Sequence, residues 1–553
     1  MARYARRMTY GFAATRPPAA RNEPILGYAP GSPERAALRA RVAELGAHRI
    51  DLPCVIGGRD VHTATTRPVV SPHRHAHALG DAHLAGLPEV DAAVEAAALA
   101  WKDWSRTPWE QRAAVFLRAA DLLAGPWRQT LNAATMLGQS KTMHQAEIDA
   151  VCELVDFWRF NVEFMLRLYE EQPVSSAGVW NRLEYRPLEG FVFAVTPFNF
   201  TSIAGNLPTA PALLGNTVIW KPATTSAFSA HFLMELLRAA GLPDGVINLV
   251  YGDGARIAES ILPRRHLAGI HFTGSTGVFN SMWQAVAANV GGYRNYPRVV
   301  GETGGKDFIV VHPSADPEAV VAGVVRGAFE FQGQKCSAAS RLYAPKSLWP
   351  LLKARLQEEI AQIRVGDPAE PAVFMGAVID AKAFARHRAA IADAQAHPRA
   401  EIVAGGGTDD SVGWFVEPTV IETRDADFPL LAEELFGPIL TVYVYPDGQW
   451  ADTLRLVDRT GPYGLTGAVF ATDRAAIAEA HEALRYAAGN FYVNDKPTGA
   501  VVGQQPFGGA RGSGTNDKAG SLWNLIRWVS PRAVKETLAP PTDWRYPFLS
   551  PGA

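Results

Sequence analysis

After a proline-rich start, the hydrophobic positions of the chain repeat every three to four residues. This spacing runs over about residues 90–168 and is clearest over 113–123 and 148–160. Apolar residues with this period share one face of a helix, so the segment predicts long helices that pack against a core.

From Tyr185 the pattern changes to short apolar runs separated by turns and by helical segments such as 229–240. The runs that predict strands are 191–195, 217–220, 246–250, 269–272 and 308–311. Strands that alternate with helices indicate a doubly wound α/β domain with a parallel sheet. A second alternating stretch covers about residues 314–473, so we expect the chemistry in a cleft between two α/β domains.

The composition is typical of a folded protein with more than one domain. The chain has 553 residues, of which 48% are hydrophobic and 20% charged. Its formal net charge is -2, with acids and bases interleaved. We therefore expect small-molecule partners, and neither nucleic acid nor a membrane surface.

The three cysteines, Cys54, Cys152 and Cys336, are far apart and form no CxxC or Cys/His motif. We expect a reducing compartment, no disulfide framework and no metal site. No run approaches the ~20 apolar residues that cross a bilayer, and no secretory signal opens the chain. Residues 1–21 contain several arginines and no acid, as a mitochondrial transit peptide does. We expect an ordinary N-terminal extension and a cytoplasmic protein, with the mitochondrial matrix as the alternative.

Cys336 is the best candidate for a nucleophile. It lies in the segment FQGQKCSAASR (331–341) among small and polar residues, with Gly333 and Lys335 close by. Such a setting can favour the thiolate. An isolated free cysteine is more often a small buried residue, so the segment alone leaves both interpretations open.

Two further segments offer a candidate base and an oxyanion donor. Glu302 lies in GETGGKD (301–307), a glycine-rich turn where the backbone can approach a ligand and a carboxylate can act as general base. Asn199 lies in TPFNF (196–200), directly after a predicted strand, and its amide could donate to an oxyanion. A solvated acid and an ordinary turn asparagine are the alternatives.

Three segments could hold a dinucleotide. FTGSTG (272–277) joins a strand to a helix, so its amides could bind pyrophosphate, although a plain glycine turn would look similar. Lys221 ends another predicted strand and could reach an adenosine ribose. Glu434 and Phe436 offer an acid and a ring for a sugar hydroxyl and a heterocycle. A surface lysine and a helix-terminating sequence are the alternatives.

Together and in this order, these segments resemble the aldehyde dehydrogenase superfamily, from about Asn22 to the C-terminus. Within it, the chain is most similar to the pyrroline-5-carboxylate dehydrogenase branch. The segments that carry this similarity are QAEID (145–149) with CEL (152–154), TPFNFT (196–201), YVYP (443–446) and VNDKPTGAVVGQQPFGGAR (493–511).

The resemblance implies oxidation of L-glutamate gamma-semialdehyde to L-glutamate in proline catabolism, with NAD as cofactor. Cys336 would attack the aldehyde, the Asn199 side chain and the Cys336 amide would stabilise the oxyanion, and Glu302 would activate water to hydrolyse the thioester. The implied cofactor residues are Thr196, Pro197, Phe198, Lys221, Thr224, Gly274, Ser275, Thr276, Gly277, Val278, Glu434 and Phe436. Thr224 stands where many NAD-specific members carry a glutamate, which leaves NADP open.

The resemblance also implies a substrate pocket that suits a zwitterion. Its residues would be Glu153, Phe200, Ser337, Gly499, Ala500 and Phe507. The serine and the two loop amides would hold the carboxylate, the two rings would flank the aliphatic stem, and the acid would lie near the entrance.

The implied architecture is a three-part α/β fold. A Rossmann-type NAD-binding domain with N-terminal helices would cover 1–174 and 188–301, and a catalytic domain 302–520. A hairpin at 175–187 and residues 521–553 would mediate oligomerisation, so we expect at least a homodimer. A dehydrogenase for another short semialdehyde such as succinic semialdehyde, a catalytically inactive homologue with a binding role, and a cysteine hydrolase are the alternatives.

Overall fold

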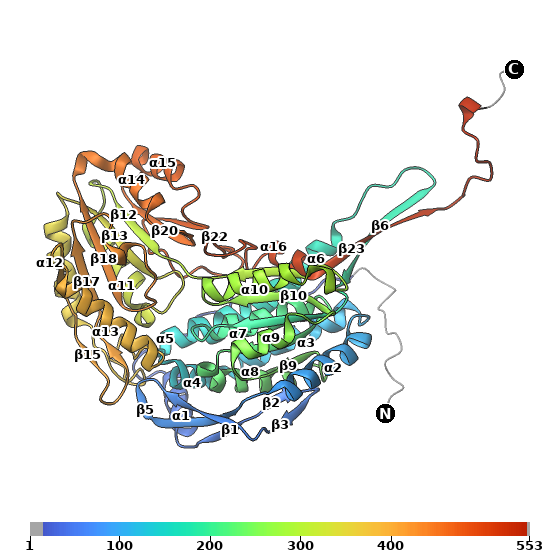
Figure 1. Cartoon of the computed structure of the whole chain (residues 1–553), viewed down its shortest axis with the longest axis horizontal. Helices are drawn as coiled ribbons and strands as arrows, with labels where there is room; N and C mark the ends of the chain where they lie inside the picture. Colours follow the sequence, from blue (N-terminus) through green and yellow to red (C-terminus); the bar gives the residue numbers. More distant parts are fainter. Residues whose placement is uncertain (1–14, 550–553) are drawn as a thin grey trace.

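The computed structural model describes residues 15–549, which form two lobes, each built on a seven-stranded sheet (Figure 1). The strand order of the first sheet is β11-β10-β7-β8-β9-β2-β3. These strands are β2 (Cys54–Ile56), β3 (Arg59–Val61), β7 (Phe191–Thr196), β8 (Thr217–Pro222), β9 (Ile247–Leu249), β10 (Leu267–Thr273) and β11 (Arg298–Glu302). The parallel strands β7, β8 and β10 are nearly continuous apolar runs because both faces of the sheet are covered.

Helices cover both faces of the first sheet. Helix α2 packs on one face beside α9, while α7 packs on the other with α3, α6 and α8 behind it. The helices of this lobe are α1 (Pro33–Gly46), α2 (Leu87–Trp104), α3 (Trp109–Ala124), α4 (Arg128–Gln139), α5 (Met143–Ala146), α6 (Leu154–Glu170), α7 (Thr201–Leu213), α8 (Ala227–Ala239), α9 (Gly254–Ile261) and α10 (Thr276–Ala288). The predicted helical region thus becomes α2 to α6.

Two features of this lobe differ from the predicted pattern. Residues Glu147–Glu153 form a π-helix that runs into α6, where we expected one regular helix. The sequence pattern gave no elements for the segment before α2, which supplies β2 and β3 and a small sheet of order β1-β5-β4. The strands of that small sheet are β1 (Ile50–Leu52), β4 (Thr66–Ser71) and β5 (Arg74–His83).

The second lobe has strand order β14-β17-β18-β13-β12-β20-β21. Its strands are β12 (Asp307–Val311), β13 (Ala339–Pro345), β14 (Ala400–Ala404), β17 (Thr419–Thr423), β18 (Ile439–Tyr445), β20 (Thr466–Phe470) and β21 (Asn490–Val493). Its helices are α11 (Pro317–Phe329), α12 (Trp349–Gln362), α13 (Ala381–Ala396), α14 (Trp450–Arg459) and α15 (Arg474–Ala483). Separate apolar clusters lie on its two faces, one under α11 and α12 and the other under α14 and α15. The predicted doubly wound α/β fold is therefore confirmed in both lobes.

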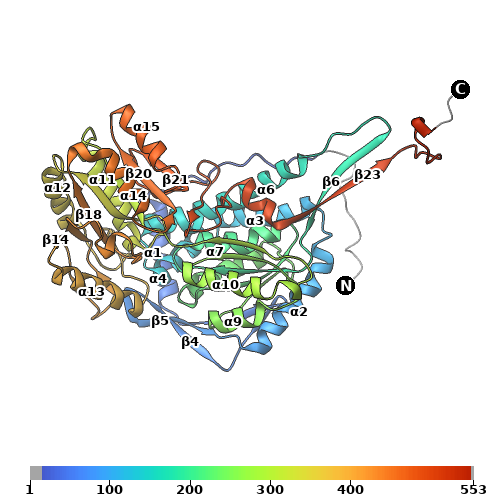
Figure 2. The same ribbon diagram turned by 45° about the horizontal axis from the view of Figure 1, so that its top comes forward.

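A two-stranded ribbon extends away from both lobes (Figures 1 and 2). It pairs β6 (Val179–Pro187) antiparallel with β23 (Val529–Thr537). The expected association of segment 175–187 with C-terminal residues is confirmed, but the segment is not itself a hairpin: it contributes one strand, and the partner strand comes from the C-terminal region. The remaining short elements are β15 (Thr408–Asp409), β16 (Phe415–Val416), β19 (Tyr463–Gly464), β22 (Ala510–Arg511) and α16 (Leu522–Leu525).

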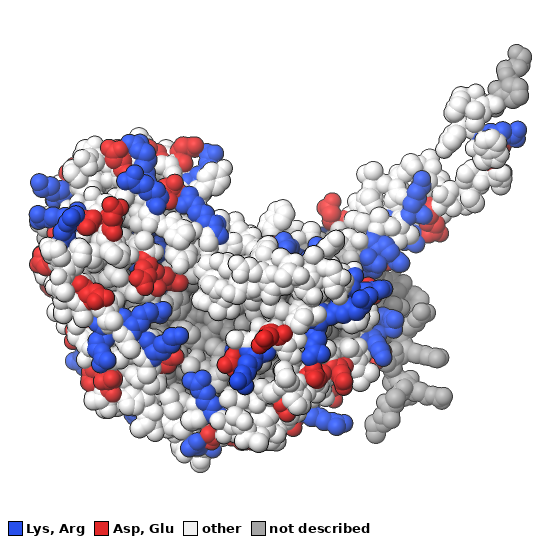
Figure 3. Space-filling view, viewed as in Figure 1, with Lys and Arg blue, Asp and Glu red and all other residues white. Residues whose placement is uncertain are grey.

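Charged side chains of both signs are spread over the surface of the protein. Lysines, arginines and acids are interleaved over both lobes on the face shown in Figure 3. Among the helices within residues 15–549, none is long and apolar enough to cross a membrane. Most of the segment proposed as a transit peptide, residues 1–14, lies outside the described residues.

Candidate active site

Cys336 lies in the turn between α11 and β13, just after the short 3-10 turn Glu330–Gly333. In that turn Phe331 and Gln332 have positive φ angles of 53° and 55°, and Gly333 has 63°. A left-handed conformation costs a residue other than glycine about 1–3 kcal/mol and persists only where the surroundings enforce it. The backbone that leads to the cysteine is therefore held by contacts with other parts of the fold.

Two glutamine side chains provide those contacts. The Gln332 Nε2 donates to the carbonyl oxygens of Ser140, at 3.0 Å, and Ala377, at 2.8 Å. The Gln334 Oε1 accepts from the Ile379 amide at 2.9 Å. The sequence analysis gave neither glutamine a role, because their partners are distant along the chain.

Asn199 reaches the cysteine turn from the other lobe. It lies between β7 and α7, is buried, and its Nδ2 donates to the Gln334 carbonyl oxygen at 3.0 Å. An amide group carries two N–H donors, so the second can serve an oxyanion formed beside Cys336. The structure thus brings together two of the three residues predicted for catalysis.

The Cys336 thiol does not have the electropositive setting that the sequence suggested. The Nζ of Lys335 lies 3.0 Å from Oε2 of Glu330, and both side chains are buried. Burial raises the pKa of the Cys336 thiol, and the carboxylates of Asp307 and Glu302 raise that pKa further. The expected activation by Lys335 is wrong, because the charge of this lysine is already paired with Glu330.

A raised thiol pKa predicts how alkylation depends on pH. Only the thiolate reacts with iodoacetamide, so the rate at Cys336 should rise about tenfold per pH unit from about pH 7 to 9. Mass spectrometry of peptides from the protein without cofactor measures this rate. Cys54 and Cys152 are fully buried and should react more slowly. A rate that levels off below about pH 8 would contradict the raised pKa.

Glu302 is the last residue of β11 and points toward the loop that follows β21. Its Oε2 accepts from the Gly509 amide at 3.1 Å, and its carbonyl oxygen accepts from the Gly274 amide at 3.2 Å. Burial raises the pKa of Glu302 well above its ordinary value, and the hydrogen bond from Gly509 opposes this rise. A carboxylate with a raised pKa is a stronger base toward water, which suits the predicted role.

The start of α10 is open to an anionic ligand. Ser275 caps this helix, with its Oγ accepting from the Val278 amide at 3.4 Å. Val278 is 50% exposed, and a Cβ built on Gly277 would meet no atom within 4 Å. The Thr276 Oγ1 donates to the Gly512 carbonyl oxygen at 3.2 Å, so its hydroxyl is engaged. Free amides and the positive end of the helix dipole fit a pyrophosphate here.

Lys221 ends β8 near the start of α9. Its Nζ lies 3.3 Å from a Cβ built on Gly254, and within residues 15–549 it has no hydrogen bond or ion pair. Burial lowers the pKa of this ammonium group. Thr224 is partly exposed in the turn after β8, whereas the Thr196 hydroxyl accepts from the Trp220 indole at 3.0 Å and serves the fold. Lys221 is therefore the free donor on this side of the site.

The second lobe contributes Glu434 and Phe436. The Phe436 and Phe198 rings meet edge to face with centroids 5.8 Å apart, which joins the two lobes beside the partly exposed Pro197. The Glu434 Oε1 accepts from the Gly305 amide at 2.9 Å. A flat ring and a half-buried acid are the groups that a nicotinamide riboside would need.

Ser337 lies beside the loop predicted to bind the carboxylate. Its Oγ donates to the Thr498 Oγ1 at 2.8 Å, and the next residues are Gly499, with φ 92°, and Ala500. The positive φ favours glycine at this position. The hydroxyl and the loop amides are therefore placed on one side of the cysteine.

The two predicted aromatic walls have different surroundings. Phe200 meets Phe331 edge to face at 6.4 Å between centroids. Phe507 pairs through its backbone with Ala519 in the loop that holds Glu302. Two rings that flank a substrate stem need no direct contact with each other, and their joint role stays a prediction.

A buried ion pair supports the Phe200 wall, and the sequence analysis missed it. The Lys141 Nζ lies 2.6 Å from Oδ2 of Asp149, and 4.1 Å and 4.2 Å from the centroids of the Phe200 and Phe331 rings. Both ionic side chains are fully buried. Asp149 also accepts from the amides of residues 201 and 202, at 3.0 Å and 2.9 Å, and so caps α7 directly after the Asn199 turn. Asp149 ends the quoted segment QAEID (145–149), but nothing in that segment indicates that it pairs with Lys141.

The acid predicted at the pocket entrance lies on the same structural unit. Glu153 ends the π-helix, and its Oε2 accepts from the Ser202 hydroxyl at 3.1 Å. Burial, together with the nearby charge of Asp149, raises the pKa of Glu153 to about 8. A nearby ammonium group on a ligand would favour the charged carboxylate.

The variant Lys141→Met tests the importance of the buried pair for stability. It removes a cation and leaves Asp149 buried with only backbone donors, which should lower the free energy of unfolding by about 3 kcal/mol. Urea denaturation followed by fluorescence measures the change. The matched control is Arg485→Met, which breaks an exposed ion pair with Glu482 and should cost less than about 1 kcal/mol. Equal effects of the two variants would show that the pair does not stabilise the fold.

Comparisons with known proteins agree with this geometry. The family model described as "Aldehyde dehydrogenase family" matches residues 60–534. The protein named delta-1-pyrroline-5-carboxylate dehydrogenase, mitochondrial, of Bos taurus is 52% identical over 529 residues, which covers 96% of this chain and 94% of that protein. Its Homo sapiens counterpart is 50% identical with the same coverage.

A solved structure extends the likeness to three dimensions. The delta-pyrroline-5-carboxylate dehydrogenase of Mycobacterium tuberculosis bound with NAD has a TM-score of 0.94 and 55% sequence identity. The match covers 98% of this chain and 100% of that structure. The family model and these relatives span both lobes, and this chain therefore belongs to the aldehyde dehydrogenase family.

Proposed function

We propose that this protein is an NAD-dependent enzyme that oxidises L-glutamate gamma-semialdehyde, the open form of pyrroline-5-carboxylate, to L-glutamate. The observation that carries the proposal is the contact of Asn199 with the Cys336 turn. It occurs in a chain whose relatives, about half identical over nearly their full length, are named pyrroline-5-carboxylate dehydrogenases. Proline catabolism is the process in which this oxidation belongs.

The proposed reaction begins when Cys336 loses its proton and its sulfur forms a bond to the aldehyde carbon. The second N–H of Asn199 and the Cys336 amide hold the resulting oxyanion. NAD, when bound, supplies the acceptor for the hydride that leaves this carbon as the thioester forms. Glu302 then takes a proton from water, the hydroxide attacks the thioester, and glutamate departs as the thiolate re-forms.

The residues proposed to hold the cofactor lie on both sides of the cleft. Lys221 and Glu434 would bind the two riboses, the start of α10 would bind the pyrophosphate, and Phe436 would lie against the nicotinamide side. Thr224 leaves the adenosine ribose without the carboxylate that would exclude a 2′-phosphate. NAD remains our proposal because a solved relative at 55% identity is bound with NAD.

For the substrate, we assign its carboxylate to Ser337 and the amides of Gly499 and Ala500. Phe200 and Phe507 would flank the aliphatic stem. Glu153 would meet the ammonium group, and a carboxyl with a pKa of about 8 becomes charged when that group arrives. The proposed pocket thus has a donor end, an apolar middle and an acidic entrance, as a zwitterion requires.

Reduced-cofactor absorbance tests the substrate and cofactor together. Pyrroline-5-carboxylate and succinic semialdehyde would each be assayed with NAD and with NADP. We expect the highest kcat/KM for pyrroline-5-carboxylate with NAD, because succinic semialdehyde has no ammonium group for Glu153. A preference for succinic semialdehyde would overturn the substrate, and a preference for NADP would overturn the cofactor. Inactivity with all four combinations would favour an inactive homologue.

Assembly, domains and location are also proposals. We propose that 1–174 and 188–301 bind the cofactor and 302–520 carry the nucleophile. The β6–β23 ribbon and residues 521–549 would join copies into at least a homodimer, which light scattering would detect. We expected a cytoplasmic protein, whereas the bovine and human relatives are named as mitochondrial proteins, which supports the mitochondrial alternative. Localisation of a tagged full-length chain decides between them.

A further inference from the structure

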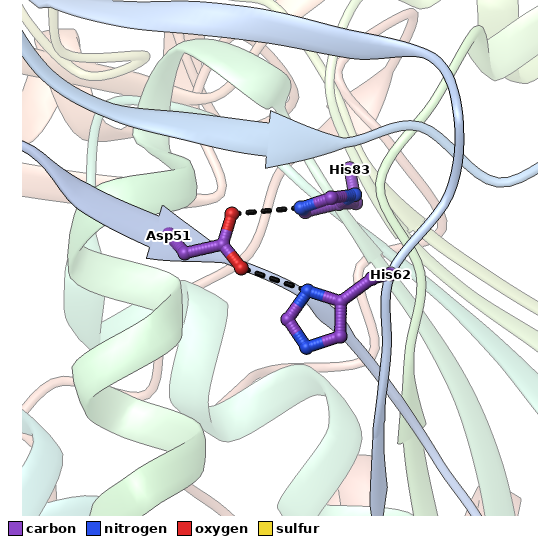
Figure 4. A group of neighbouring side chains, drawn as sticks. All are labelled: Asp51, His62 and His83. Atoms are coloured by element: carbon purple, nitrogen blue, oxygen red, sulfur yellow. Dashed lines mark hydrogen bonds and ion pairs between the residues drawn. The ribbon is translucent and has the colours of Figure 1, made fainter.

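Two histidines and an aspartate meet at the junction of the two N-terminal sheets (Figure 4). Asp51 lies in β1 and His83 ends β5, both in the small sheet, whereas His62 follows β3 at the edge of the seven-stranded sheet. The Asp51 Oδ1 is 2.7 Å from Nε2 of His83, and its Oδ2 is 2.7 Å from Nδ1 of His62. One donor atom from each side chain lies within 4.8 Å of the others. None of the three belongs to the proposed catalytic, cofactor or substrate sites.

Both ring nitrogens of His83 have polar partners. Its Nδ1 lies 2.9 Å from the Thr63 carbonyl oxygen and 2.8 Å from the Thr63 amide. If the single ring proton is on Nε2, it donates to Asp51, and the bare Nδ1 accepts from the Thr63 amide. If the proton is on Nδ1, it donates to the Thr63 carbonyl oxygen, and the bare Nε2 faces the carboxylate of Asp51. The second tautomer therefore leaves a nitrogen and a carboxylate as neighbouring donors for a cation.

A cation bound by Nε2 and the carboxylate would stabilise the tautomer with the proton on Nδ1. The Nδ1–H would donate to the Thr63 carbonyl, as metal-bound imidazoles generally donate their second N–H to a carbonyl or carboxylate. The imidazole and carboxylate donors match Zn²⁺, which binds nitrogen and oxygen at roughly 2.0–2.2 Å. His83 is nearly buried and fixed, whereas the His62 side chain is 57% exposed and free to rotate toward the metal.

We propose that Asp51, His62 and His83 form a site for a divalent transition metal, with Zn²⁺ as its best match and a fourth position open to water. The metal would join β1 and β5 of the small sheet to the end of β3. It would therefore add a link between the small sheet and the edge of the seven-stranded sheet. The expectation of no metal came from the cysteine pattern, and the spacing of these three residues matches no sequence motif.

The test uses the full chain in a Cys336→Ala background, because a thiol in the active site also binds Zn²⁺. After chelation and dialysis, Zn²⁺ alone is titrated by calorimetry, and the thermal midpoint is measured with and without it. We expect one equivalent per chain and a higher midpoint with metal. Co²⁺ should also bind and give the visible absorption of a low-coordinate nitrogen and oxygen site.

Three variants make the test specific. Asp51→Asn and His62→Gln change exposed residues and should each weaken Zn²⁺ binding by at least about tenfold. His48→Gln, at an exposed histidine in the segment before β1, is the matched control and should bind like the parent protein. Absence of saturable binding, or equal binding by all three variants, would overturn the proposal. Neither outcome depends on whether the proposed oxidation is correct.

Discussion

A Cys336→Ala protein should oxidise no measurable pyrroline-5-carboxylate while it folds like the native chain. Without the sulfur no covalent intermediate forms. The remaining groups only position the aldehyde, and they cannot replace the nucleophile that allows hydride to leave its carbon. Removal of a nucleophile lowers turnover by a factor on the order of 10⁴ or more. Reduced-cofactor formation at saturating substrate measures the loss, and circular dichroism with thermal unfolding checks the fold.

The control for that variant is Cys54→Ser. The Cys54 thiol is buried and donates to the His83 carbonyl oxygen at 3.2 Å, a bond that a hydroxyl can replace. Turnover should therefore stay near the native value. Ordinary turnover by a clean Cys336→Ala preparation would exclude this cysteine as the nucleophile.

Replacing Glu302 by glutamine should stall the enzyme after the hydride has left. Oxidation to the thioester does not need the base, whereas hydrolysis does. Rapid mixing should then show a burst of reduced cofactor of about one equivalent per chain, followed by a steady rate about 10²–10⁴-fold below that of the native protein. Glutamine keeps the shape of the side chain, and its amide oxygen can still accept from the Gly509 amide.

The burst separates this role from a structural one. If Glu302 only supported the loop at Gly509, the variant would lose the burst and the steady rate together. Native steady rates in Glu302→Gln would remove this residue from the mechanism. Asn199 offers a useful contrast, because loss of an oxyanion donor slows formation of the thioester and lowers the burst rate itself.

The sequence predicted the strands around the site because they are continuous apolar runs. β7, β8, β10 and β12 are covered on both faces, so most of their positions are apolar and the pattern stands out. β1 and β3 have only three residues each, and β5 is rich in histidine and small residues, so neither period nor hydrophobicity marks them. The partner of β6 comes from more than 300 residues away, and a local pattern cannot name such a partner.

For the site, the sequence identified the groups that do chemistry and missed those that hold them. Cys336, Asn199 and Glu302 stand in motifs that suggest their chemistry. Asp149 also stands in a quoted segment, QAEID (145–149), but its pairing with Lys141 is recognised only once burial is known. The wrong expectation for Lys335 had a visible warning, since Glu330 stands five residues before it and takes its charge. The charges that act on the Cys336 thiol depend on which groups pair in space, and proximity in the sequence does not show that pairing.

The most direct test of the account is the covalent state of Cys336 during turnover. Glu302→Gln protein would be mixed with pyrroline-5-carboxylate and NAD, quenched in acid within the burst, digested, and examined by mass spectrometry. The account predicts one glutamyl group, in thioester linkage, on the peptide that contains Cys336. Reduced cofactor formed in the burst without any adduct on that peptide would contradict it.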